Sequence, residues 1–373
     1  MIRQSNGKRI KEMSKRVCII STVDFTRMTV ASVYTDYLKE KEIPFDIIYV
    51  DKFREKARDP FGARKTYGFV PDSKNEWGKM KKLIAFWKIR KFALKIFEKN
   101  QYDFIIVWNE LTAFIFSDIL ASKFEKKYCV NIRDYQYFSL FPVKIRLGKA
   151  IKKALFTTVS SKAYLEYLPS HNCHMMYSFN KGILEKARPH TSLQEQGKPI
   201  RILYIGQIAW LENVFKFMNA LKNDSRFEMV FAGGGSEQAE QYAREHNIQN
   251  ARFYGRFQPD ETAKYLKEAD ILYNLYGTES KHLTTAVSIK FYYAAYLHIP
   301  ILVYQGTEME RMAKQCGIGF AVKNIESSVY ANNLYTWYYM LDQKEVNKKC
   351  ESFFKNVTEG QRAIYNLVDK GVR

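Results

Sequence analysis

The chain has 373 residues, which is too long for one ordinary domain and suits two. Hydrophobic residues make up 46% and charged residues 26%, so the composition excludes a disordered or fibrous chain. Residues 1–196 carry 37 basic and 20 acidic side chains, whereas residues 197–373 carry 22 and 19. Nearly all of the formal net charge of +20 therefore lies on the first half, which we expect to meet an anionic surface.

The cysteines and the hydropathy of the chain indicate the cellular compartment in which the protein is expected. The five cysteines are odd in number and too widely spaced for a zinc site, so we interpret them as reduced thiols of a cytosolic protein. The first sixteen residues are polar and basic and lack the apolar core of a secretion signal. The most apolar run, 104–121, is interrupted by Asn109, Glu110 and Asp118. These features predict an intracellular protein without an integral membrane segment.

In the first half, short apolar runs alternate with longer amphipathic stretches. The amphipathic stretches predict helices, notably over Thr29–Lys41 and Glu76–Asn100. The apolar runs predict strands over Val17–Val23, Phe45–Val50, Phe104–Trp108, Tyr128–Ile132, Phe156–Val159 and His174–Met176.

The second half repeats this alternation with an unrelated sequence. Strands are predicted over Ile200–Ile205, Phe227–Ala232, Ala251–Tyr254, Ile271–Asn274, Pro300–Val303 and Gly319–Val322. Helices are predicted over Val214–Lys222, Gln238–His246, Pro259–Ala269, Ile289–Leu297 and Met309–Cys316.

Strands that alternate with helices are typical of α/β folds with a parallel sheet. We therefore predict two Rossmann-like, doubly wound domains that face each other across a cleft, where the carboxyl ends of the strands bind ligands. The expected parts are a basic flexible extension over 1–16, a first domain over 17–185, a linker over 186–198, a second domain over 199–345, and over 346–373 a helix that returns to the first domain.

Three patterns in the second half indicate a phosphate-bearing ligand. The strand 200–205 runs into Gly206 and Gln207 before a helix, where a glycine lets the backbone approach a phosphate. The strand 227–232 ends in three glycines that include Gly233 and Gly234, for which a plain tight turn is an equal alternative. A third helix begins near Ser288, and a buried strand follows it after Pro300.

In order and spacing, these patterns resemble the donor-binding domain of GT-B glycosyltransferases. More closely, 200–322 is similar to the family 4 type that builds bacterial capsule, O-antigen and exopolysaccharide. The resemblance implies a GT-B fold, a UDP-linked nucleotide-sugar donor, and transfer that is retaining and uses no metal. It also implies a lipid-linked saccharide acceptor at the cytoplasmic face of the membrane.

The chain departs from that family at four places. The family usually carries an Arg after the first glycine and a Lys a few residues later, both contacting the donor diphosphate, whereas Gln207 and Glu212 stand here. Thr285 and Tyr293 occupy the places of the family's paired glutamates, the second of which normally holds the donor ribose. Ribose recognition must therefore differ, and the sequence indicates a divergent subfamily.

Lys290 remains near the start of the third helix, where a cation and the helix dipole can together neutralise a diphosphate. The alternative is a solvated helix lysine. We predict a catalytic role for Lys290 as well as donor contacts from Gly206, Gln207, Gly233, Gly234, Tyr276, Lys281, His282, Ser288 and Lys290.

Acceptor contacts are expected at the ends of strands in the first half. Asp24, Thr26 and Arg27 follow the first strand, and Asn109 with Glu110 follow the strand 104–108.

Asp134 follows the strand 128–132 and is the other predicted catalytic residue. It can accept a hydrogen bond from a sugar hydroxyl or from the attacking oxygen. The alternatives are a helix cap and a salt bridge with Arg133.

No metal site and no bound cofactor are predicted. The sequence has no Asp-x-Asp, and its six histidines show no ligand spacing. Transfer then depends on stabilising the leaving diphosphate, positioning the sugar and aligning the acceptor hydroxyl.

The basic excess concentrates in two stretches. Residues 135–165 contain no acid, and the helix predicted over 76–100 carries eight bases among aromatic side chains. Basic amphipathic helices with aromatics are typical of anionic membrane surfaces, although core-facing aromatics beside solvated lysines would look the same. No nucleic-acid-binding signature occurs, so nucleic acid is not expected as a partner. The residues expected at the membrane are Lys144, Arg146, Lys149, Lys152 and Lys153.

These features together predict a hexosyltransferase of bacterial surface polysaccharide synthesis, peripheral at the inner face of the cell membrane. Two alternatives stay open. One is a nucleotide-sugar enzyme with a soluble or protein acceptor, or an epimerase. The other is a non-catalytic nucleotide-sugar-binding partner of a polysaccharide assembly complex.

Overall fold

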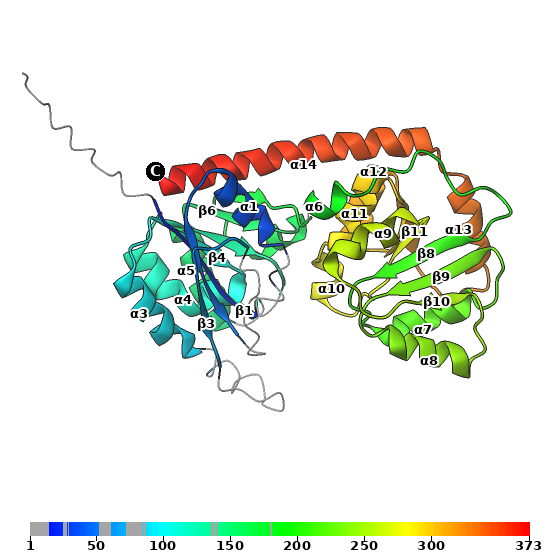
Figure 1. Cartoon of the computed structure of the whole chain (residues 1–373), viewed down its shortest axis with the longest axis horizontal. Coiled ribbons are helices and arrows are strands. Elements are labelled where there is room, and N and C mark those ends of the chain that lie inside the picture. The colour runs from blue at the N-terminus through cyan, green and yellow to red at the C-terminus, as the bar shows by residue number, and fades with distance from the viewer. Residues whose placement is uncertain are drawn as a thin grey trace, which may run out of the picture. The chain divides into compact units, whose positions relative to one another are not determined.

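The structure is a computed structural model (Figure 1). It describes residues 15–24, 28, 30–51, 61–71, 84, 87–135, 138, 141–179 and 181–373. Most of the extension predicted over 1–16 and most of the first half of the helix predicted over 76–100 lie outside these residues.

The chain divides into two compact units. Unit 1 comprises Met1–Asn131, Pro142–Thr157 and Tyr365–Arg373, and unit 2 comprises Ile132–Phe141 and Thr158–Ile364. The linker predicted over 186–198 lies inside unit 2, and the domain bounds drawn from the sequence stay a prediction.

The first sheet has seven strands in the order β3-β2-β1-β4-β5-β6-β7. β1 pairs in parallel with β2 and β4, so that Ile19 stands opposite Ile47 and Ile106. The central strands are buried on both faces, which is why they appear as continuous apolar runs in the sequence. The strands are β1 (Val17–Asp24), β2 (Phe45–Val50), β3 (Lys65–Phe69), β4 (Phe104–Trp108), β5 (Tyr128–Ile132), β6 (Phe156–Val159) and β7 (Cys173–Met175).

Every strand predicted from an apolar run is present, and β3 is an additional strand. β3 lies at the edge of its sheet and pairs in parallel with β2. Its side chains are exposed or half-buried, so it lacks the apolar run by which the other strands are recognised.

The helices that follow these strands are α1 (Ser32–Glu40), α3 (Ile89–Lys99), α4 (Glu110–Lys123), α5 (Phe141–Lys153), the 3-10 helix η2 (Lys162–Tyr167) and α6 (Lys181–Leu184). One carboxylate connects α3, α4 and α5. Asp118 on α4 accepts hydrogen bonds from Arg90 on α3 and from Arg146 on α5. These bonds and charges, those of Arg90 first, hold the pKa of Asp118 well below its usual range.

The second sheet has six strands, all parallel, in the order β10-β9-β8-β11-β12-β13. Its strands are β8 (Ile200–Ile205), β9 (Phe227–Ala232), β10 (Ala251–Phe253), β11 (Ile271–Asn274), β12 (Ile301–Tyr304) and β13 (Gly319–Val322). The strand order reverses between β8 and β11. The connections that leave these two strands diverge to opposite faces, which opens a crevice at their carboxyl ends.

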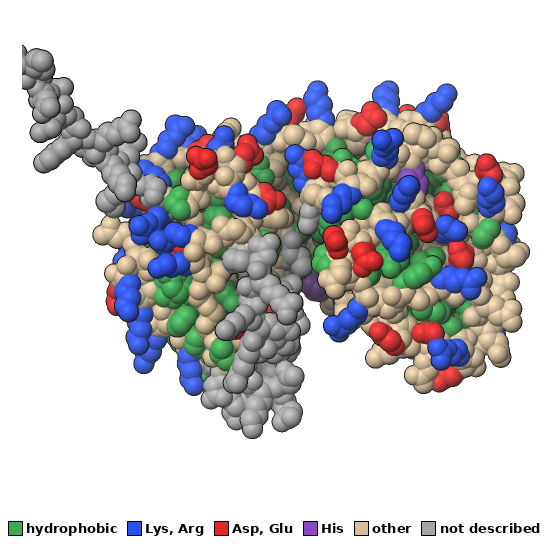
Figure 2. Space-filling model, in the orientation of Figure 1, with side chains coloured by type: hydrophobic (Ala, Val, Ile, Leu, Met, Phe, Trp, Pro, Cys, Tyr) green, Lys and Arg blue, Asp and Glu red, His purple; other side chains and the backbone are tan. Residues whose placement is uncertain are grey.

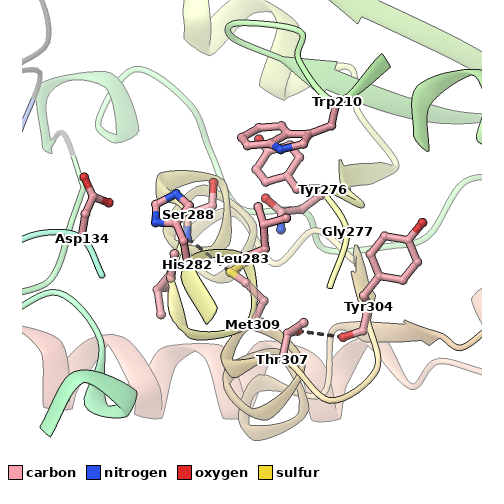
Figure 3. A pocket seen from close by; sticks show the side chains of 13 residues that line it. Asp134, Trp210, Tyr276, Gly277, His282, Leu283, Ser288, Tyr304, Thr307 and Met309 are labelled. Atoms are coloured by element: carbon pink, nitrogen blue, oxygen red, sulfur yellow. Dashed lines mark hydrogen bonds between the residues drawn. The ribbon is translucent and has the colours of Figure 1, made fainter. Parts of the chain in front are cut away.

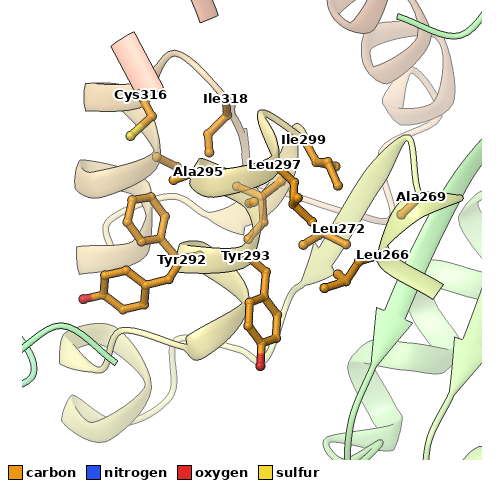
Figure 4. Packing of buried hydrophobic residues seen from close by; sticks show 14 of the residues in the cluster. Leu266, Ala269, Leu272, Tyr292, Tyr293, Ala295, Leu297, Ile299, Cys316 and Ile318 are labelled. Atoms are coloured by element: carbon orange, nitrogen blue, oxygen red, sulfur yellow. The ribbon is translucent and has the colours of Figure 1, made fainter. Parts of the chain in front are cut away.

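Helices cover both faces of this sheet. Side chains of α9, α11 and α12 form one core cluster (Figure 4), and those of α7, α8 and α13 form the other. The helices are α7 (Leu211–Ala220), α8 (Ser236–Glu245), the 3-10 helix η3 (Pro259–Glu261), α9 (Thr262–Lys267), α10 (Lys281–Thr285), α11 (Ile289–Leu297), α12 (Glu308–Cys316), α13 (Tyr330–Tyr339) and α14 (Gln343–Val372).

Surface charge differs between the two units. On the face of unit 2 seen in Figure 2, acidic and basic side chains are interspersed, whereas basic side chains predominate along the edge of unit 1 that carries α3. Among the described residues, no helix is both long enough and apolar enough to cross a membrane.

Candidate functional site

Three glycine-containing loops meet at the carboxyl ends of β8, β9 and β10. The amide of Gly206 donates to Ala232 O at 2.9 Å, and the amide of Gly233 donates to Gly255 O at 2.7 Å. Gly233 has φ +143°, and a Cβ on it would lie 1.7 Å from Gly206 O. Gly233 is therefore required by the close approach of two loops, and its amide and that of Gly206 already have backbone partners.

A cavity of about 200 Å³ lies within unit 2, at the reversal between β8 and β11 (Figure 3). Its walls come from the loop after β8, the end of β11, the segment through α10 to the start of α11, and the loop between β12 and α12. Of the predicted site residues, Asp134, Tyr276, His282 and Ser288 line it.

α11 begins at this cavity. The side chain of Ser288 caps the helix by accepting a hydrogen bond from the amide of Lys290 at 3.3 Å. A helix N-terminus carries a partial positive charge and attracts anions.

Lys290 is only 4% exposed and is not among the residues that line the cavity. Its ammonium lies 4.0 Å from the ring centroid of Tyr204 and 4.7 Å from that of Tyr276, and it donates a hydrogen bond to the Tyr276 hydroxyl. Burial lowers the pKa of Lys290 well below its usual range. Lys290 is therefore neither a solvated helix lysine nor a group on the cavity wall, and it supports Tyr276 from behind.

Trp210 lines the cavity and was not recognised in the sequence. Its ring stacks on Tyr276 with centroids 4.4 Å apart and an interplanar angle of 26°. Figure 3 shows the indole lying over the Tyr276 ring at one end of the site. The only available signal was a large aromatic residue shortly after Gly206, in the loop that precedes a helix.

Two polar side chains at the cavity carry buried atoms without a hydrogen-bond partner among the described residues. They are Oδ1 of Asn274, at the end of β11, and Nδ1 of His282, on α10. Buried polar atoms without partners are rare in folded proteins and call for an explanation such as a ligand.

No known family model and no curated protein matches this sequence. Solved structures do match. Sucrose-phosphate synthase from Thermosynechococcus elongatus superposes with a TM-score of 0.69 at 11% identity, over 95% of this chain and 99% of that one. Anabaena HepE in complex with UDP has a TM-score of 0.67 at 10% identity, over 95% of this chain and 100% of that one. A glycosyltransferase from Rickettsia africae has a TM-score of 0.67 at 11% identity, over 97% of this chain and 99% of that one.

The chain has the GT-B fold. The prediction of two parallel-sheet, Rossmann-like domains of GT-B type is thereby confirmed. At these identities the likeness concerns the fold, and the site must be argued from its own residues.

Thr285 and Tyr293, which the sequence resemblance placed where family 4 enzymes carry paired glutamates, make structural contacts within unit 2. The hydroxyl of Ser161 donates to Thr285 O at 2.6 Å. Tyr293 packs in the core cluster of unit 2 (Figure 4), so its side chain belongs to the interior.

Two more predicted donor residues lie apart from the cavity lining. Gln207 is exposed, and both it and Arg256 approach Gly234, since a Cβ on Gly234 would lie 3.0 Å from Gln207 Oε1 and 3.1 Å from Arg256 Nε. Lys281 is exposed, and its hydrogen bond to Tyr167 raises its pKa. Their donor roles stay predictions.

The predicted acceptor residues of the first half are largely buried. Asn109 has φ +73° and caps α4 by accepting hydrogen bonds from the amide and hydroxyl of Thr112, each at 2.8 Å. Glu110 and Asp24 are also buried. Thr26 and Arg27 lie outside the described residues, and the acceptor role of this group stays a prediction.

Asp134 follows β5 and is half-buried at the edge of the unit-2 cavity. Its neighbour Arg133 donates to Ser178 Oγ at 2.8 Å. Within the described part of the chain, no cluster of three or more His, Cys, Asp or Glu could hold a metal ion. Metal independence stays a prediction.

Proposed function

We propose that the protein is a glycosyltransferase that moves a hexosyl group from a nucleotide sugar, UDP-linked, to a lipid-linked saccharide. The observation that carries the proposal is the cavity of unit 2, which lies at the carboxyl ends of β8 and β11 of a GT-B fold and into which α11 opens by its N-terminus. Structures of the same fold hold UDP, and UDP with glucose, in Anabaena HepE.

The chemistry follows from the groups around the cavity. When the bond between the anomeric carbon and the diphosphate oxygen breaks, negative charge collects on the leaving diphosphate. The first turn of α11 is oriented to stabilise an anion, and Lys290, when it is protonated, adds positive charge behind Tyr276. We assign to Asp134, which lines the cavity, the acceptance of a hydrogen bond from a sugar hydroxyl or from the attacking oxygen. As in the family 4 enzymes that the sequence resembles, transfer would be retaining and would use no metal.

The acceptor proposal rests on one face of α5. Phe141 and Ile145 are 73% and 56% exposed, although both are apolar. Lys144, Lys149 and Lys152 are exposed as well, and their spacing places them with the two apolar side chains along one stripe of the helix. We call these five residues the α5 surface.

An exposed stripe of this composition suits the headgroup region of an anionic membrane. The other two bases predicted there have partners within unit 1. Arg146 donates to Asp118, and Lys153 pairs with Glu125 at 2.7 Å. We therefore assign membrane contact to the α5 surface, at the inner face of the cell membrane, with surface polysaccharide as the product.

A ligand screen by thermal shift tests the donor. The chain should be stabilised by UDP-sugars more than by GDP- or CMP-sugars, because a ligand that binds only the folded state raises the melting temperature. If none of these nucleotide sugars stabilises it, the proposed function is wrong.

A nucleotide-sugar epimerase is the second candidate. A putative UDP-N-acetylglucosamine 2-epimerase from Listeria monocytogenes has a similar fold, with a TM-score of 0.58 at 13% identity over 90% of each chain. Product analysis separates the two candidates. A transferase yields a sugar bound to the lipid-linked saccharide, whereas an epimerase releases an altered sugar or nucleotide sugar with no acceptor present.

A further inference from the structure

One end of the cavity in unit 2 is formed by a fixed pair of aromatic rings. Trp210 is 41% exposed and stacks on Tyr276 (Figure 3). Tyr276 is held from behind, because Lys290 donates to its hydroxyl and the ring of Tyr204 lies 6.0 Å away, centroid to centroid. A large apolar ring is thus kept at the margin of a cavity with much of its surface open to solvent.

The backbone of Trp210 is in an unusual conformation. Its φ of +53° and ψ of +51° place it in the left-handed region, which bulky residues rarely adopt. Such conformations persist where surrounding contacts impose them, and they cluster at ligand sites. Here the strained residue directly precedes α7 and brings the indole over Tyr276.

Asn274 provides an independent observation. It is only 5% exposed, it lines the same cavity, and its Oδ1 has no hydrogen-bond partner among the described residues. A diphosphate at neutral pH offers acceptors and no donors, so it cannot satisfy this oxygen. Asp134, on the same cavity, is also an acceptor when ionised. The cavity therefore suits a ligand that carries hydroxyl or N–H hydrogen-bond donors.

The size of the cavity limits the ligand further. Its volume of about 200 Å³ is below the roughly 300–1,000 Å³ that drug-sized ligands occupy. The cavity thus has room for one ring-sized group of a larger ligand. A pyranose has an apolar face for an aromatic ring and hydroxyls around its edge for acceptors.

We propose that Trp210 and Asn274 recognise the glycosyl ring of the donor. Trp210 packs against the apolar face of the pyranose, and Asn274 Oδ1 accepts a hydrogen bond from one of its hydroxyls. This inference rests on the proposed function and adds the residues that select the sugar. Because a buried acceptor left unpaired is costly, Asn274 favours the sugar whose hydroxyl points toward it over the epimer whose hydroxyl points away.

The test compares UDP with UDP-glucose, UDP-galactose and UDP-N-acetylglucosamine by calorimetric titration of the full chain. In the wild type, the preferred UDP-sugar should bind more tightly than UDP. Trp210→Ala should weaken the binding of that UDP-sugar by about tenfold or more, as loss of a stacking partner does. The affinity for UDP should stay unchanged. Met340→Ala, which removes a 78% exposed side chain that does not line the cavity, is the matched control and should bind as the wild type does.

Asn274→Ala separates recognition from folding. It removes an oxygen that has no hydrogen-bond partner among the described residues, so the ligand-free melting temperature should stay within about 2 °C of the wild type. Selectivity among the three sugars should fall. Equal weakening of UDP and UDP-sugar by Trp210→Ala would place the nucleobase on the indole and overturn the inference. Unchanged binding in both variants would also overturn it, with the proposed function intact. A wild type that binds none of the four ligands would overturn both.

Discussion

Gly233→Ala tests how closely the loop after β9, which carries Gly233, packs against the loop after β8, which carries Gly206. The new Cβ would lie 1.7 Å from Gly206 O, well inside any allowed contact, and the residue would have to hold φ +143°. A left-handed or related conformation costs a non-glycine residue about 1–3 kcal/mol. Overpacking adds about 1–3 kcal/mol more, so we expect a loss of roughly 2–6 kcal/mol.

Gly206→Ala is the matched control. It also has positive φ, at +98°, but its Cβ would meet nothing within 4 Å, so only the conformational cost applies. The difference between the two variants therefore isolates the collision. In a unit of this size each kcal/mol lowers the melting temperature by roughly 2–4 °C, so Gly233→Ala should melt about 2–12 °C below Gly206→Ala. Scanning calorimetry of both proteins without ligand makes the comparison. Equal melting temperatures would refute the reasoning, because the collision at Gly233 would then cost no stability.

Three further predictions concern charge. Desolvation raises the pKa of Asp270 to about 6, so its favourable contribution is present below the unfolded pKa near 4 and is lost as pH rises through 6. Asp270→Asn should therefore raise the melting temperature at pH 7.5 and have little effect at pH 4; an opposite trend in a pH series of thermal melts would contradict this. Lys290→Met replaces a buried amine by an apolar chain of similar length, so the stability should be kept while the affinity for UDP falls. The affinity of the wild type for UDP should weaken as pH rises, because only the ammonium attracts phosphate. An affinity for UDP that is the same in the variant and the wild type would remove Lys290 from the donor site. Charge reversal of the three lysines of the α5 surface should lower binding to phosphatidylglycerol vesicles by at least about 100-fold, at about 1 kcal/mol per base. Binding to phosphatidylcholine vesicles should stay unchanged, and reversal of Lys349 on α14 is the control. Equal flotation of the triple variant and the Lys349 variant would argue against the α5 surface.

Much of the fold was accessible from the sequence because buried parallel strands are continuous apolar runs. β2, β4, β5, β8 and β9 have the predicted bounds, and each is buried along most of its length. β3 was missed for the same physical reason, since an exposed edge strand needs no apolar run. The set of bases proposed to contact the membrane differs from the set predicted from the sequence. Arg146 looks like a free base in the sequence, and only the packing shows that it bonds to Asp118.

The candidate site divides along the same line. Sequence alone determined the GT-B-type alternation, the glycines after β8 and β9, and the placement of Ser288 at a helix start, because these features are set by local spacing and backbone demands. Tertiary structure decided which residues share a cavity. It placed Lys290 behind Tyr276 and brought together Trp210, directly before α7, and Asn274, at the end of β11, which are 64 residues apart in the sequence. Contacts between side chains from separate strand ends depend on strand order, and no local pattern in the sequence encodes that order.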